Sequence, residues 1–126
     1  MLSDPFRAAA ETKDFSKMNE LFAEDVVFRS PVVFKPYEGI DVLGLLLSNV
    51  AEVFEDFRYT DQVESDHSAV LVFEAKIGDR ELEGADFLRF REDGKISEMF
   101  VMIRPLSGAT ALAEEMKKRL EAAGAA

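Results

Sequence analysis

Apolar side chains recur every three or four residues in four segments of the chain, a spacing that places them on one face of an α-helix. In the second segment the repeated positions are Phe15, Met18, Leu21 and Phe22. Asp4 before Pro5, and Asp14 further on, are suited to cap the first two helices, because a short carboxylate accepts hydrogen bonds from the first helical turn. The predicted helices span residues 5–13, 15–23, 41–54 and 107–122.

Five other segments are rich in β-branched and aromatic residues, which is typical of strands. They span residues 26–30, 57–64, 69–77, 81–91 and 95–104. Gly78-Asp79 and Asp93-Gly94 separate the last three as hairpin turns. Helices that precede a run of antiparallel strands predict an α+β fold in which the helices pack on one face of a sheet.

The chain of 126 residues has the usual size of one domain. No repeat, linker or low-complexity segment interrupts the pattern. We therefore expect a single domain over residues 1–126, with its core at about 5–106 and an extra C-terminal helix at about 107–122.

Alternation along the last two strands predicts a sheet with two apolar faces. One face carries Asp86, Leu88, Phe90, Met99 and Val101, and the other carries Phe87, Phe100 and Met102. The helices are expected to pack against the first face. The second would be exposed in a monomer, and an exposed apolar patch usually marks an interface. We expect a homodimer through this outer sheet face; the alternative is that the final helix covers it.

Charge and composition exclude several classes of function. The 15 basic and 25 acidic residues give a net charge of −10, which disfavours nucleic acid and anionic membranes as partners. The chain has no cysteine, so disulfides, thiolate metal sites and cysteine nucleophiles are excluded. No apolar run approaches the ~20 residues that span a bilayer, and the N-terminus has no signal-peptide pattern. These features predict a cytoplasmic protein.

No motif for a metal or a cofactor is recognisable, and we expect neither. The sequence has no glycine-rich phosphate loop and no Gly-x-Ser-x-Gly elbow. Its single histidine, His67, lies in the polar stretch Glu64–Ser68, which predicts a surface loop.

Four strings follow one another in a recognisable order. They are Lys13-Asp14-Phe15, Leu21–Phe28, Tyr37-Glu38-Gly39, and Glu83–Phe90 continued by Asp93–Ile96. With the order of elements, they resemble the nuclear-transport-factor-2-like superfamily, and within it the SnoaL-like proteins, over roughly residues 5–106. Ketosteroid isomerases and polyketide cyclases belong to the same group. The resemblance implies a cone, in which a strongly bent antiparallel sheet wraps round the N-terminal helices and leaves a deep cavity.

The resemblance also allows the isomerase residues to be checked position by position. The position of the proton-abstracting carboxylate falls on Ser30, before Pro31, and the position of the tyrosine donor falls on Phe6. The position of the protonated aspartic acid falls on Asp86, which is kept. Serine does not abstract a carbon-bound proton without an activating partner, so ketosteroid isomerase activity is not expected.

Asp86 is the candidate catalytic residue. Apolar neighbours raise the pKa of a carboxyl group, and such groups cluster at functional sites. The alternative is a structural carboxylate that is bonded to donors inside the cone. The candidate ligand-binding wall consists of Phe6, Phe22, Phe28, Ser30, Phe34, Tyr37, Phe54, Leu88, Phe90, Met99 and Val101. For each apolar member, plain core packing is the alternative.

The sequence therefore predicts a SnoaL-like protein that binds a small hydrophobic or aromatic ligand bearing a carbonyl or hydroxyl group. Binding alone fits the residues, and so does acid/base chemistry of the isomerase, cyclase or hydrolase type with Asp86 as the acid/base. The alternative is a non-catalytic dimeric interaction or structural module of the same fold, because fold alone does not give function.

Overall fold

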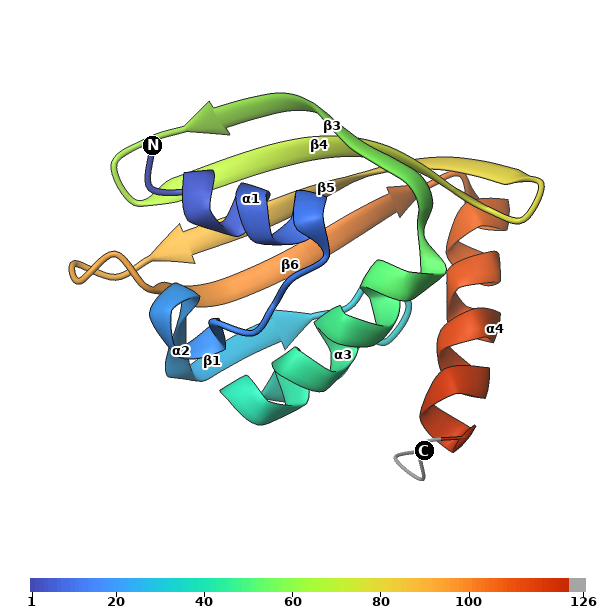
Figure 1. Cartoon of the computed structure of the whole chain (residues 1–126), viewed down its shortest axis with the longest axis horizontal. Coiled ribbons are helices and arrows are strands. Elements are labelled where there is room, and N and C mark those ends of the chain that lie inside the picture. The colour runs from blue at the N-terminus through green and yellow to red at the C-terminus, as the bar shows by residue number, and fades with distance from the viewer. Residues whose placement is uncertain (123–126) are drawn as a thin grey trace.

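Six strands form one curved, open sheet, and the helices lie along one side of it and at one end (Figure 1). The computed structural model describes residues 1–122. Its helices are α1 (Asp4–Thr12), α2 (Met18–Leu21), α3 (Ile40–Val53) and α4 (Leu106–Ala122). Its strands are β1 (Phe22–Arg29), β2 (Tyr37–Glu38), β3 (Glu55–Glu64), β4 (Ser68–Ile77), β5 (Arg80–Phe90) and β6 (Ile96–Arg104). The predicted α+β fold with a bent sheet and an extra C-terminal helix is confirmed.

The strand order in the sheet is β2-β1-β6-β5-β4-β3. Neighbouring strands are antiparallel except for β1 and β6, which run parallel, with Phe28 opposite Met99. β3, β4, β5 and β6 form a meander, and the connection from Ile77 to Arg80 is the predicted two-residue turn at Gly78-Asp79. Register irregularities in β1, β3 and at the end of β5 accompany the bend, because bulges increase the local twist of a sheet.

The second predicted helix is wrong over most of its length. Only Met18–Leu21 is helical, and Phe22, assigned to that helix from its spacing, is the first residue of β1. Phe22 pairs with Ile96 of β6 and is 1% exposed. A place in the buried sheet therefore outweighs the weak helical preference of this segment.

The start of α1 also differs from the prediction. Asp4 is the first helical residue and Ser3 occupies the cap position, but the Ser3 side chain makes no capping hydrogen bond within the helix. β2 was not predicted either; it is a two-residue strand that pairs with β1 through Tyr37 and Phe28.

The two faces of the C-terminal hairpin are as alternation predicts. Asp86, Leu88 and Met99 are buried on the concave face. Phe87 and Phe100 stack on the convex face, with ring centroids 4.4 Å apart and an interplanar angle of 2°. Beside them, Met102 is 59% exposed.

α4 does not cover this convex face. It packs against α3 and against the concave side of the sheet, where Gly108 approaches Leu82 so closely that an added Cβ would lie 2.7 Å from the Leu82 Cβ. The helix stands at one end of the sheet (Figure 1). Among the described residues, nothing covers the stacked Phe87 and Phe100. None of the described helices is both long and apolar enough to cross a bilayer.

Candidate functional site

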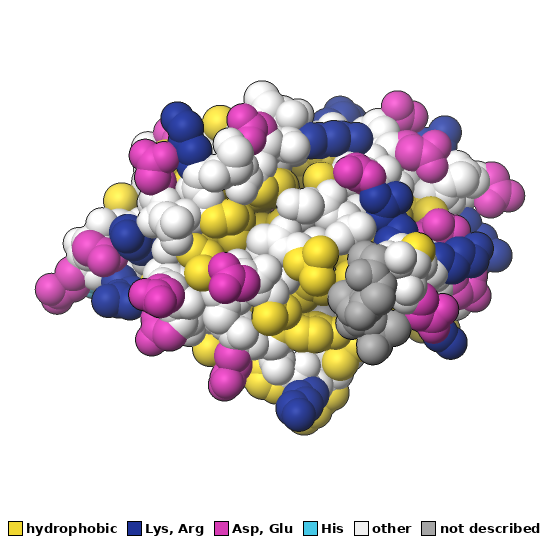
Figure 2. Space-filling view, turned by 60° about the horizontal axis from the view of Figure 1, so that its bottom comes forward, with side chains coloured by type: hydrophobic (Ala, Val, Ile, Leu, Met, Phe, Trp, Pro, Cys, Tyr) yellow, Lys and Arg dark blue, Asp and Glu magenta, His cyan; other side chains and the backbone are white. Residues whose placement is uncertain are grey.

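A cavity of about 350 Å³ lies between the concave face of the sheet and the helices α1, α3 and α4. Its volume is in the range of small-molecule sites. The predicted site residues on its wall are Phe6, Phe28, Ser30, Tyr37, Phe54, Asp86, Met99 and Val101. On the helix side of the molecule, apolar side chains reach the surface between charged ones (Figure 2).

Four predicted wall residues are not on the cavity. Phe22, Leu88 and Phe90 are buried elsewhere in the core, and Phe22 packs edge-on against the ring of Phe6. Phe34 is 100% exposed, because the segment between Pro31 and Pro36 turns it outward. Apolar character predicted burial for the first three correctly, but it did not distinguish solid core from cavity wall.

The helices contribute wall residues that were not predicted as ligand contacts. From α3 and α4 they include Leu46, Leu47, Val50, Leu112, Met116 and Leu120. The helical spacing of Leu112, Met116 and Leu120 does identify one apolar face of α4. It does not reveal that this face closes the cavity, because the position of α4 depends on tertiary contacts. Arg119 makes these contacts with Asn49 and Glu52 of α3.

Asp86 is the single carboxyl group among the wall residues that the structure describes. It is 6% exposed, and the Tyr59 hydroxyl donates a hydrogen bond to its Oδ2 over 2.7 Å. Burial raises the pKa of Asp86 to about 7, and the hydrogen bond from Tyr59 acts in the opposite direction. Burial, followed by the charge of Asp86, raises the pKa of Tyr59 far above its ordinary value, so Tyr59 remains a donor.

The second carboxyl oxygen of Asp86, Oδ1, accepts no hydrogen bond from the described part of the chain. It is not fully enclosed either, because no fully buried side-chain oxygen within residues 1–122 lacks a partner. Asp86 lies on the cavity wall, so the cavity is the route by which a ligand can reach Oδ1. When Asp86 is protonated it can donate a hydrogen bond to a ligand carbonyl; when it is ionised it can accept one from a hydroxyl.

Tyr59 reaches Asp86 from β3, two strands away. The pairing of β3 with β4 shifts between Tyr59 and Asp61, so Thr60 and Asp61 are both exposed. As a result Tyr59 and Gln62 both face α1, although simple alternation would place them on opposite faces. The role of Tyr59 was not predicted. The sequence shows that Tyr59 is one of two tyrosines, but it does not show the register shift in β3 that accompanies its inward orientation.

The ring of Tyr59 is held on several sides. Phe57 packs edge-on at 4.9 Å between centroids and Phe73 edge-on at 6.3 Å, and the Arg7 guanidinium carbon lies 5.5 Å from the ring centroid. Gly84 makes room for Phe73, because a Cβ there would lie 2.5 Å from the Phe73 ring and 2.7 Å from the Met102 carbonyl oxygen. The hydroxyl is thus fixed by the packing of its ring.

The remaining polar groups on the wall come from four residues. The Ser30 hydroxyl accepts a hydrogen bond from the Val32 N–H over 3.1 Å, which is a local turn contact. Tyr37 stacks on Phe28 with centroids 6.4 Å apart. Lys13 and Lys117 also line the cavity, and the Lys13 ammonium donates to the Phe54 carbonyl over 3.4 Å. No three histidine, aspartate or glutamate side chains gather into a metal site anywhere in residues 1–122.

The sequence profile of the SnoaL-like domain matches residues 5–99. The chain belongs to the SnoaL-like family. This agrees with the cone-like sheet and with the cavity between sheet and helices, and it confirms the resemblance inferred from the sequence. A search among curated proteins gives no match for this SnoaL-like protein.

Solved structures agree with the family. A steroid delta-isomerase from Pseudomonas aeruginosa is 43% identical, with a TM-score of 0.93 over 99% of this chain and 93% of that one. An uncharacterised protein with a cystatin-like fold from Silicibacter pomeroyi DSS-3 is 29% identical, with a TM-score of 0.91 over 95% of this chain and 85% of that one. An NTF2-like protein of unknown function from Mesorhizobium loti is 18% identical, with a TM-score of 0.73 over 82% and 88%, and shows the fold alone.

Proposed function

We propose that this SnoaL-like protein binds a small apolar molecule that carries one carbonyl or hydroxyl group, and that this group hydrogen-bonds to Asp86. The observation that carries the proposal is the unequal use of the two carboxyl oxygens. Tyr59 donates to Oδ2, while Oδ1 has no donor within residues 1–122 and Asp86 lines an otherwise mainly apolar cavity. A few polar groups in an apolar hollow are the usual means of orienting a small ligand.

The form of Asp86 decides which ligand group is preferred. With a pKa of about 7, the acid and the carboxylate are both populated near neutral pH. The acid form favours a carbonyl oxygen, and the carboxylate favours a hydroxyl. Ligand binding by the acid form would raise the pKa further, because it stabilises the protonated state.

A second candidate function is acid/base catalysis in the same cavity. It is favoured by the 43% identity to a protein described as a steroid delta-isomerase. Moving a double bond requires a group that takes a proton from one carbon and returns it to another, and a group with a pKa near the working pH does this best. Asp86 is the candidate for both steps, with the hydroxyls of Ser30 and Tyr37 as further donors.

This candidate differs from the ketosteroid isomerase arrangement described above. Ser30 stands where that arrangement has its base and Phe6 where it has its tyrosine. One carboxyl would have to serve where the other arrangement uses two. We therefore place binding first and catalysis second.

A thermal-shift screen tests binding. The library contains apolar ketones, phenols and alcohols, including steroids, together with hydrocarbons of matched shape. The expected hit stabilises the wild type, stabilises Asp86→Asn less, and does not stabilise Asp86→Leu. Asp61→Asn, an exposed aspartate on β3, is the matched control and should behave as the wild type. Absence of any hit, or equal binding by Asp86→Leu, would contradict the proposal. A hit that is a β,γ-unsaturated ketone is then followed by absorbance for double-bond migration.

We further propose that two copies associate through the convex sheet face. Val63, Val70, Phe87 and Phe100 are cross-strand neighbours and form an apolar row across β3 to β6. Ion pairs flank this row: Arg89 with Glu98, Arg104 with Glu83, and Arg58 with Glu74. The face is therefore close to neutral on a chain of net charge −10, so two copies meet there with little repulsion.

A further inference from the structure

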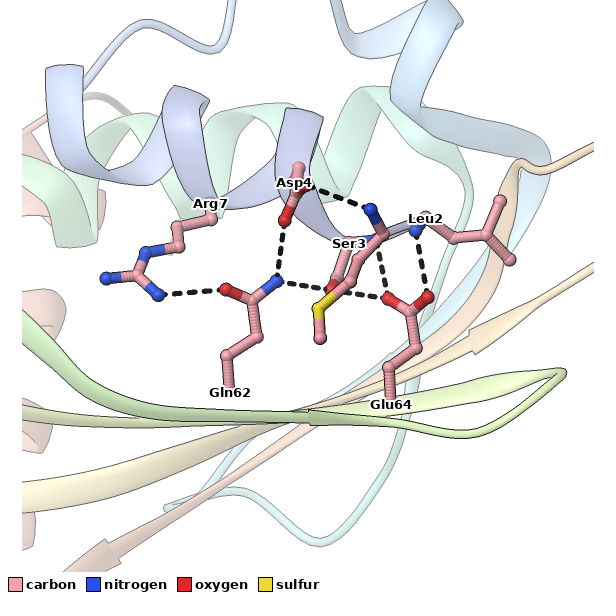
Figure 3. Close-up of polar contacts among 7 residues, drawn as sticks. Leu2, Ser3, Asp4, Arg7, Gln62 and Glu64 are labelled. Carbon is pink, nitrogen blue, oxygen red and sulfur yellow. Dashed lines mark hydrogen bonds and ion pairs between the residues drawn. The ribbon is translucent and has the colours of Figure 1, made fainter.

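A continuous chain of polar contacts joins the N-terminus to the cavity. It begins at Glu64 of β3, whose two carboxylate oxygens accept the backbone N–H groups of Leu2 and Ser3, each over 2.9 Å (Figure 3). The Ser3 hydroxyl donates to the same carboxylate over 2.6 Å, and Ser3 is fully buried. Glu64 thus fixes the first turn of α1 on the sheet and satisfies N–H groups at its start.

Gln62 forms the next link. Its Nε2 donates to the Ser3 hydroxyl over 2.7 Å and to Asp4 Oδ1 over 2.9 Å. Its Oε1 accepts a hydrogen bond from Arg7 Nη1 over 2.8 Å (Figure 3). Both the NH₂ group and the oxygen of the Gln62 amide are therefore hydrogen-bonded, and Ser3 and Asp4 at the start of α1 set its orientation.

Arg7 is the last member of this chain and points at the site. Gln62 holds Nη1 and Glu11 accepts from Nε over 3.3 Å, so the guanidinium is fixed in a plane. Its central carbon lies 5.5 Å from the centroid of the Tyr59 ring. Tyr59 in turn donates to Asp86 over 2.7 Å. A cation against the face of a phenol withdraws electron density from it and makes its O–H a stronger donor.

We propose that Arg7, held by Gln62, is a positioning residue for Asp86 that acts through Tyr59. It keeps the phenol ring in place and strengthens its hydrogen bond to Oδ2, and so limits the rise in the proton affinity of the buried carboxyl. The proposal concerns the acid on which the proposed function rests, but it applies to the ligand-free protein.

The other charged groups near Tyr59 and Asp86 are few. Arg7 lowers the pKa of Tyr59, as expected for a nearby cation, whereas Glu11 on the same helix raises it. Lys13 and Lys117 reach the cavity wall from the end of α1 and from α4. Arg7 is the one cation in residues 1–122 that lies over the Tyr59 ring.

The test is a ligand-free NMR titration of the Asp86 side-chain carboxyl carbon. In Arg7→Met we expect the pKa of Asp86 to rise by roughly half a unit, the size expected for a partly exposed cation–π contact. Arg58→Met is the matched control. It removes one positive charge from β3, the strand that carries Tyr59, but on the opposite face of the sheet, where Arg58 pairs with Glu74. It should leave the titration of Asp86 unchanged.

A double-mutant comparison separates positioning from a general effect of charge or stability. In a Tyr59→Phe background there is no hydroxyl to strengthen, so Arg7→Met should produce no further shift. Gln62→Met removes the contact that holds the guanidinium, together with the two hydrogen bonds to Ser3 and Asp4, but keeps the charge of Arg7. It should give a smaller rise in the pKa of Asp86, which keeps the test available if Arg7→Met does not fold. Arg7→Lys keeps the charge without the planar guanidinium. The pKa of Asp86 in this variant should lie between its values in the wild type and in Arg7→Met.

Two results would overturn the proposal. One is an unchanged Asp86 titration in both Arg7→Met and Gln62→Met. The other is an equal shift with and without the Tyr59 hydroxyl, which would show that Arg7 acts directly on Asp86. Because no ligand enters this experiment, its outcome is independent of the screen that tests the proposed function.

Discussion

Tyr59 and Asp86 are hydrogen-bonded to each other although β4 runs between their strands, with 2.7 Å between the hydroxyl and Oδ2. The contact spans three strands because the sheet is bent and because both side chains face the concave side. It leaves a buried acid with one donor and one oxygen open to the cavity.

The stability of the ligand-free protein should fall between pH 5 and pH 8. The pKa of Asp86 is about 7 in the folded protein, against an ordinary value of 3.8. The folded state therefore holds a proton that the unfolded chain releases earlier, and this stabilisation is lost as the pH rises through the folded pKa. The free energy of unfolding should drop by up to roughly 3 kcal/mol. Urea unfolding at both pH values measures the drop, and Asp86→Asn, which does not titrate, should remove it. A wild type and variant with the same pH dependence would contradict the raised pKa.

Tyr59→Phe should destabilise the protein more at pH 8 than at pH 5. At pH 8 Asp86 is ionised, and in the variant its carboxylate no longer accepts the hydrogen bond from Tyr59. Leaving a buried group without its partner costs about 1–3 kcal/mol. At pH 5 the carboxyl is neutral, so the loss is smaller. The comparison of urea midpoints at the two pH values checks this. Tyr37→Phe, which removes the other tyrosine hydroxyl from the cavity wall, serves as the control and should show no such difference.

The sequence predicted much of this architecture because most elements follow a single periodicity. Strict alternation along β5 and β6 placed Asp86, Met99 and Val101 on the concave face and Phe87 and Phe100 on the convex face, as observed. α3 and α4 also follow helical spacing over their whole lengths. Phe22 is the exception, because its spacing from Met18 is helical while its pairing with Ile96 places it in the sheet.

The site was less predictable than the fold. Asp86 was predicted from the family resemblance and from its apolar neighbours in the strand, and its role as a site residue remains a prediction. Tyr59 was not identified as its partner, because an irregularity in β3 decides which residues face inward, and a bulge has no fixed sequence signal. Phe34 shows the opposite error: an aromatic residue between two prolines was assigned to the wall, yet the loop exposes it completely.

Gly84→Ala should destabilise the protein by about 1–3 kcal/mol, the usual cost of overpacking. The new Cβ would lie 2.5 Å from the ring of Phe73 and 2.7 Å from the carbonyl oxygen of Met102, and the second of these is backbone and moves little. Displacing Phe73 also disturbs the ring of Tyr59, so the Asp86 titration should shift as well. Urea unfolding and the carboxyl titration measure the two effects. Gly78→Ala is a poor control because Gly78 has a φ of +63°, whereas Ala85→Gly tests the same strand without adding bulk.

Phe100→Asp should convert a dimer to a monomer. It places a charge in the middle of the apolar row on the convex face, where Phe100 stacks on Phe87 at 4.4 Å. Two copies would then bring like charges together in a desolvated interface. Sedimentation velocity of the wild type and the variant measures the change, and Val42→Asp, at an exposed apolar position on α3, is the control. A wild type that sediments as a monomer would refute the interface.

Val101→Phe should abolish ligand binding while leaving the fold intact. Val101 is the cross-strand neighbour of Asp86 and lies on the cavity wall, so a larger ring there occupies the space next to Oδ1. In a solid core such a change would cost stability, but here about 350 Å³ is free to receive it. The matched control is Val42→Phe, which adds the same ring at an exposed position on α3 that is not part of the cavity wall. Calorimetric titration with a hit from the screen should show binding by the wild type and Val42→Phe and none by Val101→Phe, with similar melting temperatures in the absence of ligand. If Val101→Phe binds as the wild type does, the ligand occupies another surface; if it melts far below the wild type, the cavity is smaller in solution than the structure indicates.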